Sequence, residues 1–322
     1  MTSLRDGVDT EGDRMAGYLS SEHCWPFRVA RMLSALTPRG KGAVPRLVGR
    51  LTRHWIHHTF RTRHGGVIPL VPEVLDVFVA MDRQGASYDY WVFRAANAML
   101  DEGGVFYDVG ANVGYMTVEV AHLRRRDAVQ VYAFEPHPRL AEAIRGAVGL
   151  NGLDNISLTE AAVGDSAGVV AFTQRGNSFI GSVAVGESPA TYSVVAVTLD
   201  EMVYERGYQP PDVVKIDVEG YEYAVLSGAR RVLAEHQPAV IFELSPGTLR
   251  YGYSPAMLFN LLLEAGDYRF YTVKCVPLLP IEFAAKAGSQ CDILAIPPRR
   301  RSRFDWFASE LRAGRIDGLW AY

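Results

Sequence analysis

The fold is decided by Val105-Phe106-Tyr107-Asp108-Val109-Gly110-Ala111-Asn112-Val113-Gly114-Tyr115-Met116-Thr117. An apolar, β-prone run stops at Gly110, and residues compatible with a helix follow Gly114, which predicts a buried strand, a tight turn and a helix start. A glycine turn lets the backbone approach a ligand closely, and the helix start presents unpaired N–H groups. Asp108 adds a fixed negative charge. A pocket here therefore suits a ligand that carries both a carboxylate and a cationic group.

The spacing Asp-x-Gly-x-x-x-Gly over residues 108–114 resembles the first motif of S-adenosylmethionine (SAM)-dependent methyltransferases. It differs from the dinucleotide fingerprint Gly-x-Gly-x-x-Gly, because Asn112 stands where the second glycine is needed. An NAD-dependent oxidoreductase on a similar sheet is therefore the less favoured alternative. A SAM-binding protein without catalytic activity is the other alternative.

The composition is that of an ordinary globular protein, with 322 residues, 48% hydrophobic, 21% charged and a net charge of −3. This charge argues against broad nucleic-acid binding. Three widely spaced cysteines indicate a reducing compartment, without a disulfide framework or a zinc site. The polar N-terminus lacks a signal-peptide core, and no apolar run reaches the ~18 residues of a membrane span. We expect a cytoplasmic protein with a small-molecule partner, no membrane or nucleic-acid partner and a possible homo-oligomeric contact.

Residues 1–80 are predicted to form an N-terminal extension, mostly helical, that acts as a lid or an oligomer contact. Residues 25–60 read as helical and basic, and the helical spacing of four apolar residues predicts one buried face: Val44, Leu47, Val48 and Leu51. Four histidines in this region (His54, His57, His58 and His64) lack a second set of metal ligands, so a metal site is not predicted. Residues 66–70 are expected to form an edge strand, and residues 86–100 an aromatic-rich helix.

Beyond the glycine turn, a second predicted strand over residues 129–134 ends at Glu135, 25 residues after Gly110. An acidic residue at this point of a βαβ unit accepts hydrogen bonds from both ribose hydroxyls of a nucleoside. A carboxylate left at a buried strand end without a role would be costly. Glu135 is therefore the predicted ribose ligand.

The remaining chain alternates strands with helices as far as residue 296, which predicts an α/β fold with a doubly wound, mostly parallel seven-stranded sheet. A third strand is expected over residues 156–163, and two extra antiparallel strands over 169–173 and 193–197. The glycine- and serine-rich loop 175–186 between these two is a candidate substrate lid or a plain hairpin tip. We predict a main domain over residues 81–298 and a C-terminal helix within 299–322, preceded by a solvated basic linker at 299–303.

Five short landmarks occur in the same order along the chain: Asp108-Val-Gly-Ala-Asn-Val-Gly114, Phe134-Glu135-Pro136, Ala162-Val163-Gly164-Asp165, Thr198-Leu199-Asp200 and Lys215-Ile-Asp-Val-Glu-Gly220. Together they resemble the FkbM-type family of SAM-dependent methyltransferases. The resemblance covers roughly residues 100–297 and leaves the first 80 unexplained. It implies a class I, Rossmann-like methyltransferase fold.

The resemblance also implies a cofactor site and a reaction. The glycine turn would cradle the methionyl end of SAM through Asp108, Gly110, Ala111, Asn112 and Gly114. Glu135 would hold the ribose, Ala161 and Ala162 would lie near the adenine, and Asp217 would face the donor methyl group and the acceptor. The family chiefly methylates hydroxyl groups of sugars, polyketides and other secondary metabolites.

Methyl transfer is an in-line displacement, so it needs an aligned acceptor oxygen and a base when the hydroxyl is not acidic. Asp217, Glu219 and Glu243 are the candidate carboxylates for this work, and Lys215 would steady the charge. Alternatively, Glu219 caps the following helix and Lys215 forms an ion pair. The three carboxylates could also bind Mg²⁺ through their oxygens, but no ligand spacing demands it, and no metal is predicted.

Overall fold

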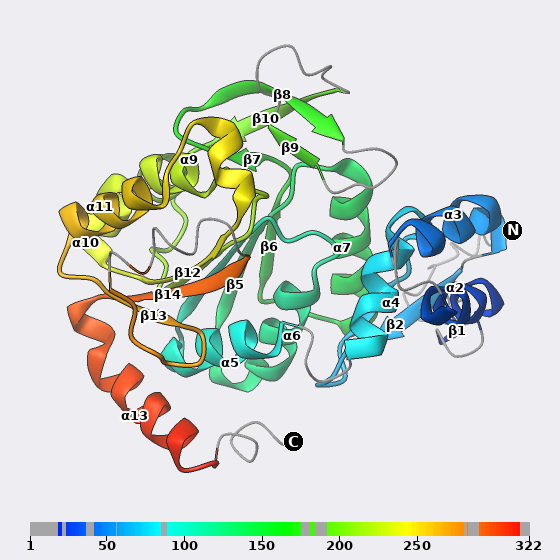
Figure 1. The fold of residues 1–322 in the computed structure, drawn as a ribbon, viewed down its shortest axis with the longest axis horizontal. Helices are drawn as coiled ribbons and strands as arrows, with labels where there is room; N and C mark the ends of the chain where they lie inside the picture. The colour runs from blue at the N-terminus through cyan, green and yellow to red at the C-terminus, as the bar shows by residue number, and fades with distance from the viewer. Residues whose placement is uncertain are drawn as a thin grey trace, which may run out of the picture.

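A seven-stranded sheet forms the centre of the computed structural model, which describes residues 19–20, 24–36, 42–55, 57–84, 89–174, 181–183, 192–279, 282 and 290–315 (Figure 1). In spatial order its strands are β13 (Arg269–Thr272), β14 (Cys291–Ile296), β12 (Ala239–Leu244), β11 (Val213–Ile216), β4 (Val105–Val109), β5 (Gln130–Phe134) and β6 (Ile156–Thr159). The five strands from β12 to β6 run parallel, and at one edge β14 pairs antiparallel with both β12 and β13. The predicted doubly wound, mostly parallel sheet is confirmed.

Alternate residues of the central strands enter two separate cores, because successive side chains of a strand point to opposite faces. In β4, Phe106 packs on one face with helices α5 (Tyr90–Met99) and α6 (Tyr115–Leu123), while Tyr107 packs on the other. That second face is covered by helices α8 (Leu199–Tyr204), α9 (Glu222–Ser227), α10 (Arg230–His236) and α11 (Pro255–Ala265). Helix α7 (Pro138–Asn151) joins β5 to β6.

A second, four-stranded sheet lies beside the first and has the order β7 (Ala162–Val163), β10 (Tyr192–Val197), β8 (Gly168–Gln174) and β9 (Gly181–Val183). The expected antiparallel pair is confirmed in β8 and β10. The single strand expected over residues 156–163 is wrong: a tight turn, in which Ala161 N donates to Thr159 O, separates β6 from β7. The candidate lid 175–186 lies outside the described residues except for β9.

The N-terminal region combines helices with a small sheet. Its elements are β1 (Leu19–Ser20), α2 (Trp25–Leu36), α3 (Ala43–Thr52), η2 (Arg53–Trp55), β2 (His58–Arg61), β3 (Val67–Pro69), η3 (Pro72–Val74) and α4 (Leu75–Gln84). The edge strand expected at 66–70 is confirmed as β3, which pairs with β2. The sequence did not predict β2 or α4. No described helix is long and apolar enough to cross a bilayer.

The face predicted for helix α3 is wrong in part: Val48 packs partly buried against the core, but the two leucines do not. Leu47 and Leu51 are exposed, whereas Pro45, Gly49 and Thr52 are buried. Gly49 explains why the leucines are exposed: the side of the helix that carries Gly49 packs so closely that a Cβ there would lie 1.8 Å from the carbonyl oxygen of Pro72. The helix therefore packs closely through its small side chains, and its long apolar side chains face outward.

Two polar clamps attach the N-terminal region to the helices beside the glycine turn. The side-chain amide of Asn151 in α7 pairs with the backbone of Val67, at 2.8 Å from its N–H and 2.7 Å from its carbonyl. The buried carboxylate of Glu119 in α6 accepts hydrogen bonds from the Thr62 hydroxyl and from the backbone and ring of His64. The His64 ring also stacks on Phe93 of α5.

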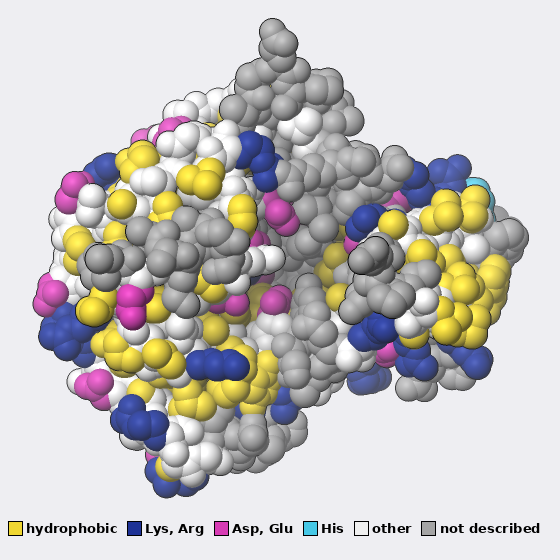
Figure 2. All heavy atoms as spheres, in the orientation of Figure 1, with side chains coloured by type: hydrophobic (Ala, Val, Ile, Leu, Met, Phe, Trp, Pro, Cys, Tyr) yellow, Lys and Arg dark blue, Asp and Glu magenta, His cyan; other side chains and the backbone are white. Residues whose placement is uncertain are grey.

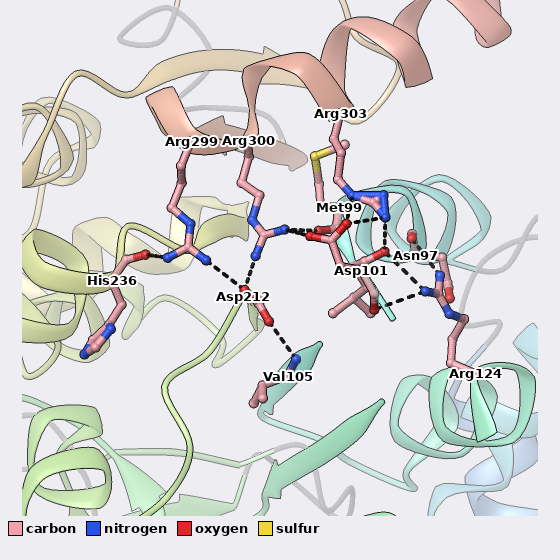
Figure 3. A network of polar contacts seen from close by, with 11 residues as sticks. Asn97, Met99, Asp101, Val105, Arg124, Asp212, His236, Arg299, Arg300 and Arg303 are labelled. Carbon is pink, nitrogen blue, oxygen red and sulfur yellow. Dashed lines mark hydrogen bonds and ion pairs between the residues drawn. The ribbon is translucent and has the colours of Figure 1, made fainter. Parts of the chain in front are cut away.

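An ion-pair network fixes the C-terminal helix α13 (Arg301–Arg312), and the predicted solvated linker is wrong (Figure 3). Arg300 is buried, and its guanidinium pairs with Asp212 and, at 2.6 Å, with Asp101. Arg299 reaches Asp212 at 3.0 Å, and Arg303 reaches Asp101 at 2.7 Å. Asp212 also accepts a hydrogen bond from the N–H of Val105, so this network holds the start of β4. On α13, Arg303 lies one turn before Phe307, on the side of the helix that Phe304 and Phe307 bury.

Replacing Arg300 should test the network, because its removal leaves the Asp212 carboxylate without its buried partner. We expect Arg300→Gln to lower the free energy of unfolding by about 2–4 kcal/mol in urea titrations. The control Arg230→Gln removes an exposed pair with Glu264 and should cost at most about 1 kcal/mol. Equal losses in the two variants would contradict a structural role for the network.

Candidate functional site

Two neighbouring pockets open where the parallel strands end. The glycine-turn pocket is lined by residues that follow β4, β5 and β11 and by the second sheet: Val109, Gly110, Asn112, Phe134, Glu135, Pro136, Leu140, Ala161, Ala162, Val163, Phe172, Val183, Asp217, Val218, Glu219 and Tyr221. The carboxylate pocket is lined by Asp89, Val92, Lys215, Ile216, Asp217, Ile241, Phe242, Glu243, Gln290, Cys291 and Asp292. Asp217 belongs to both linings. Such pockets are expected at this edge, since parallel strands bring their carboxyl ends together there.

The glycine turn is shaped by close backbone contact. Gly110 has a φ of +77°, and a Cβ there would lie 2.0 Å from the carbonyl oxygen of Asp217. The N–H groups of Gly110 and Ala111 both donate to the carbonyl of Phe134 at 3.0 Å. These contacts draw the ends of β4, β5 and β11 together, so that a ligand can lie directly over the turn.

Asn112 connects the turn to the next strand. Its backbone has a φ of +54°, and its N–H donates to Glu135 Oε2 at 2.8 Å. Its side-chain Oδ1 is buried and accepts no hydrogen bond from the described part of the chain. A buried acceptor without a donor is costly, so Asn112 Oδ1 is a contact point for a hydrogen-bond donor on a ligand.

Glu135 is a buried carboxylate on the wall of the glycine-turn pocket. It accepts one backbone hydrogen bond from Asn112 and another from His137, each at 2.8 Å. Burial raises the pKa of Glu135 to about 7, although these two donors oppose the shift. Its carboxylate lies at the end of β5, where the sequence predicted a ribose ligand.

Lys215, which lines the carboxylate pocket, lies in β11 directly opposite Asp108 of the neighbouring strand β4. Lys215 Nζ is 3.2 Å from Asp108 Oδ1 and 3.5 Å from Asp217 Oδ2, and it donates to the Gly110 carbonyl at 3.2 Å. The hydroxyl of Thr117 donates to the other Asp108 oxygen at 2.6 Å. Burial alone would lower the pKa of Lys215, but the carboxylates of Asp108, Asp217 and Asp89 outweigh it and raise this pKa.

The carboxylate pocket collects four acidic side chains around Lys215. Antiparallel pairing of β12 with β14 places Glu243 opposite Asp292. Burial first, and then the nearby Asp217, raise the pKa of Glu243 to about 8 and that of Asp292 to about 6. Asp89 precedes α5 with a φ of +45° and does not cap that helix with its side chain. Desolvation of its carboxylate raises the pKa of Asp89 to about 7, against the attraction of Lys215.

The structure divides the predicted site residues among three places. The glycine-turn pocket takes Gly110, Asn112, Glu135, Ala161, Ala162, Asp217 and Glu219, and the carboxylate pocket takes Lys215, Asp217 and Glu243. Asp108, Ala111 and Gly114 line neither pocket. Asp108 lies behind the turn, where it holds Lys215. Of the two alternatives for this segment, the ion pairs of Lys215 are confirmed. The cap by Glu219 is wrong, because the N-cap of α9 is Tyr221 and no side chain caps it. Glu222 instead accepts hydrogen bonds from the N–H groups of Val218 and Gly220.

Sequence reasoning missed Asp89 and Asp292 in the carboxylate pocket. The only signal for Asp292 was its place at the start of the last strand, and pairing with Glu243 needs the antiparallel register. It also missed Phe172 and Val183, which reach the glycine-turn pocket from the second sheet. Within the described residues, no group of three or more His, Cys, Asp or Glu side chains has an arrangement that could hold a metal ion.

The sequence of this chain is similar to that of known methyltransferases. A family model described as the methyltransferase FkbM domain matches residues 108–270. The hexuronic acid methyltransferase AglP of Haloferax volcanii is 28% identical over 178 residues, which are 54% of this chain and 67% of that protein.

Solved methyltransferase structures are similar at lower identity. The FkbM methyltransferase of Methylobacillus flagellatus KT is 16% identical with a TM-score of 0.42, and the match covers 68% of this chain and 54% of that one. This chain therefore spans about half the length of that protein. The precorrin-6y C5,15-methyltransferase of Geobacter metallireducens GS-15 is 13% identical with a TM-score of 0.35, over 57% of this chain and 73% of that one. Because the family match extends over half of the chain and includes Gly110, Glu135 and Asp217, the protein belongs to the FkbM methyltransferase domain family.

Proposed function

We propose that this methyltransferase transfers a methyl group from SAM to a hydroxyl of a sugar-like acceptor. SAM would occupy the glycine-turn pocket, and the acceptor would occupy the carboxylate pocket. The observation that carries this proposal is that Asp217 lines both pockets, so one carboxylate borders both binding sites. The family match favours this reaction over the NAD-dependent alternative.

The glycine-turn pocket fits SAM group by group. Glu135 offers carboxylate oxygens to the ribose hydroxyls, and Ala161, Ala162 and Leu140 offer apolar surface to the adenine. The unpartnered Oδ1 of Asn112 offers an acceptor to the ammonium of the methionyl end. When bound, SAM supplies an electrophilic methyl group on a sulfonium. Asp108 acts indirectly, by holding Lys215 beneath the turn.

The carboxylate pocket fits an acceptor that donates several hydrogen bonds. Carboxylate oxygens accept hydrogen bonds, and the hydroxyls of a sugar are matching donors. Lys215 is already paired with Asp108 and Asp217, so an anionic acceptor would face carboxylates without a free cation from Lys215. The name of the Haloferax relative supports a sugar substrate. For this chain we propose a neutral or amine-bearing sugar in place of a sugar acid.

Asp217 would act as the base, or would orient the acceptor hydroxyl. The Asp217 side chain is partly exposed, and its Oδ2 lies 3.5 Å from Lys215 Nζ. This contact limits the directions in which the carboxylate can point, which is what in-line attack requires. Glu243, whose pKa is raised to about 8, would act as a hydrogen-bond donor at neutral pH.

Affinity for SAM should depend on the ionisation of Glu135. Because its pKa is raised to about 7, the carboxylate is ionised above this pH and accepts the ribose hydroxyls best there. By calorimetry, we expect SAM to bind about tenfold more weakly at pH 6 than at pH 8. Glu135→Gln should bind weakly at both pH values with a flatter profile, and the exposed control Glu142→Gln should behave like the natural protein. An identical profile in Glu135→Gln and the natural protein would exclude Glu135.

Replacing Asp217 should separate chemistry from binding. We expect Asp217→Asn to retain SAM binding but to slow methyl transfer by ~10²–10⁴-fold, the range for a positioned acid–base group. The assay follows labelled methyl transfer from SAM to a panel of neutral, amine-bearing and acidic monosaccharide glycosides. The exposed Asp154→Asn serves as the control. Full-rate transfer by Asp217→Asn would remove this carboxylate from the mechanism, and preferential transfer to acidic glycosides would overturn the proposed acceptor class.

Mg²⁺ is not required by this proposal. We expect EDTA to leave methyl transfer unchanged, because Lys215 already pairs with Asp217 in the carboxylate pocket. Among the described residues, no group of three or more His, Cys, Asp or Glu side chains is arranged to hold a metal ion. Loss of activity in EDTA with recovery on added Mg²⁺ would show instead that the carboxylates hold a metal.

A further inference from the structure

The charge of the N-terminal region differs sharply from that of the whole chain. Although the protein carries a net charge of −3, residues 24–63 contain no Asp or Glu. The same stretch contains nine basic residues: Arg28, Arg31, Arg39, Lys41, Arg46, Arg50, Arg53, Arg61 and Arg63. A segment of this composition is attracted to anionic surfaces.

Two neighbouring helices in this stretch also expose large apolar side chains. On α2, Trp25, Met32 and Leu36 are 51%, 59% and 72% exposed, and their spacing places them on one stripe. On α3, Leu47 and Leu51 are 55% and 69% exposed, one turn apart. These five are among the twelve large apolar side chains that are exposed in the described part of the chain. Together with Arg28, Arg31 and Arg50 they are called the α2–α3 face.

The α2–α3 face results from how the two helices pack. The inner side of α2 buries Phe27, Ala30 and Ser34, and that of α3 buries Gly49, so the apolar side chains of the α2–α3 face lie on the outer sides of both helices. Figure 2 shows hydrophobic side chains gathered over these helices, with Lys and Arg side chains around them. The helices lie at one end of the long axis of the molecule (Figure 1), where a flat surface can reach them.

We propose that the α2–α3 face docks the enzyme on an anionic lipid bilayer. Tryptophan and leucine side chains insert at the boundary between headgroups and acyl chains, and arginines beside them pair with anionic headgroups. A second copy of the chain fits this face poorly, because residues 24–63 contain no acidic residue. Asp82, which borders the face, is already paired with Arg31 at 3.1 Å. The docking is peripheral and differs from the sequence-based expectation of no membrane partner.

Vesicle sedimentation tests the proposal with the full chain. We expect binding to phosphatidylcholine vesicles that contain about 30% phosphatidylserine, little binding to pure phosphatidylcholine, and weaker binding as salt is raised. The double substitution Leu47→Glu with Leu51→Glu should reduce binding at least about tenfold, because it removes two inserting side chains. Both leucines are exposed, so SAM binding and thermal stability should be retained.

Leu263→Glu provides the matched control. Leu263 lies on α11, away from the face, and is 45% exposed, so its substitution should leave vesicle binding intact. Absence of binding to the anionic vesicles, or an equal loss in the control, would overturn the proposal. Equally tight binding to soluble polyglutamate would point to an acidic protein instead. A concentration-dependent dimer that the double substitution disperses would assign the face to a second copy.

Discussion

The buried ammonium of Lys215 is the constraint on which the centre of the molecule depends. The sheet register sets it against Asp108, and it also contacts the Gly110 carbonyl and Asp217. A charge removed from water needs partners, and loss of one typically costs several kcal/mol. Two strands, the glycine turn and the wall between the pockets are therefore held by one group. Asp108, predicted from the sequence to contact the ligand, lines neither pocket and instead holds this lysine.

The two pockets differ because they draw on different parts of the sheet. The glycine-turn pocket lies over parallel strands, where short connections supply backbone groups and the carboxylates of Glu135, Asp217 and Glu219. The carboxylate pocket borders the antiparallel edge, where β14 brings Asp292 beside Glu243. Asp217 stands at the boundary. In the function proposed above, the methyl donor and a hydrogen-bond-donating acceptor would therefore occupy separate surfaces on the two sides of one residue.

Local sequence signals predicted the parallel sheet and the site around the glycine turn, because these depend on neighbouring residues: the strand, Gly110 and Gly114, and Glu135 after the next strand. They failed where distant segments meet. Asp292 joins the site through antiparallel pairing, and Arg300 is ordered by Asp101, 199 residues earlier. Leu47 and Leu51 matched a buried-face pattern, but the close contact between Gly49 and Pro72 turned them outward. Apolar periodicity cannot reveal such a contact.

The strand order also affects how the chain folds during synthesis. Strand β14 inserts between β12 and β13, so the apolar strand β12 keeps one unpaired edge until residues 291–296 have left the ribosome. About 50 residues separate the two strands, which corresponds to several seconds at roughly 5–20 residues/s. During that interval the nascent protein presents a strand edge with unpaired backbone N–H and C=O groups, which can pair with another chain. Late completion of the sheet therefore lengthens the time in which a nascent chain can pair with another chain through this edge.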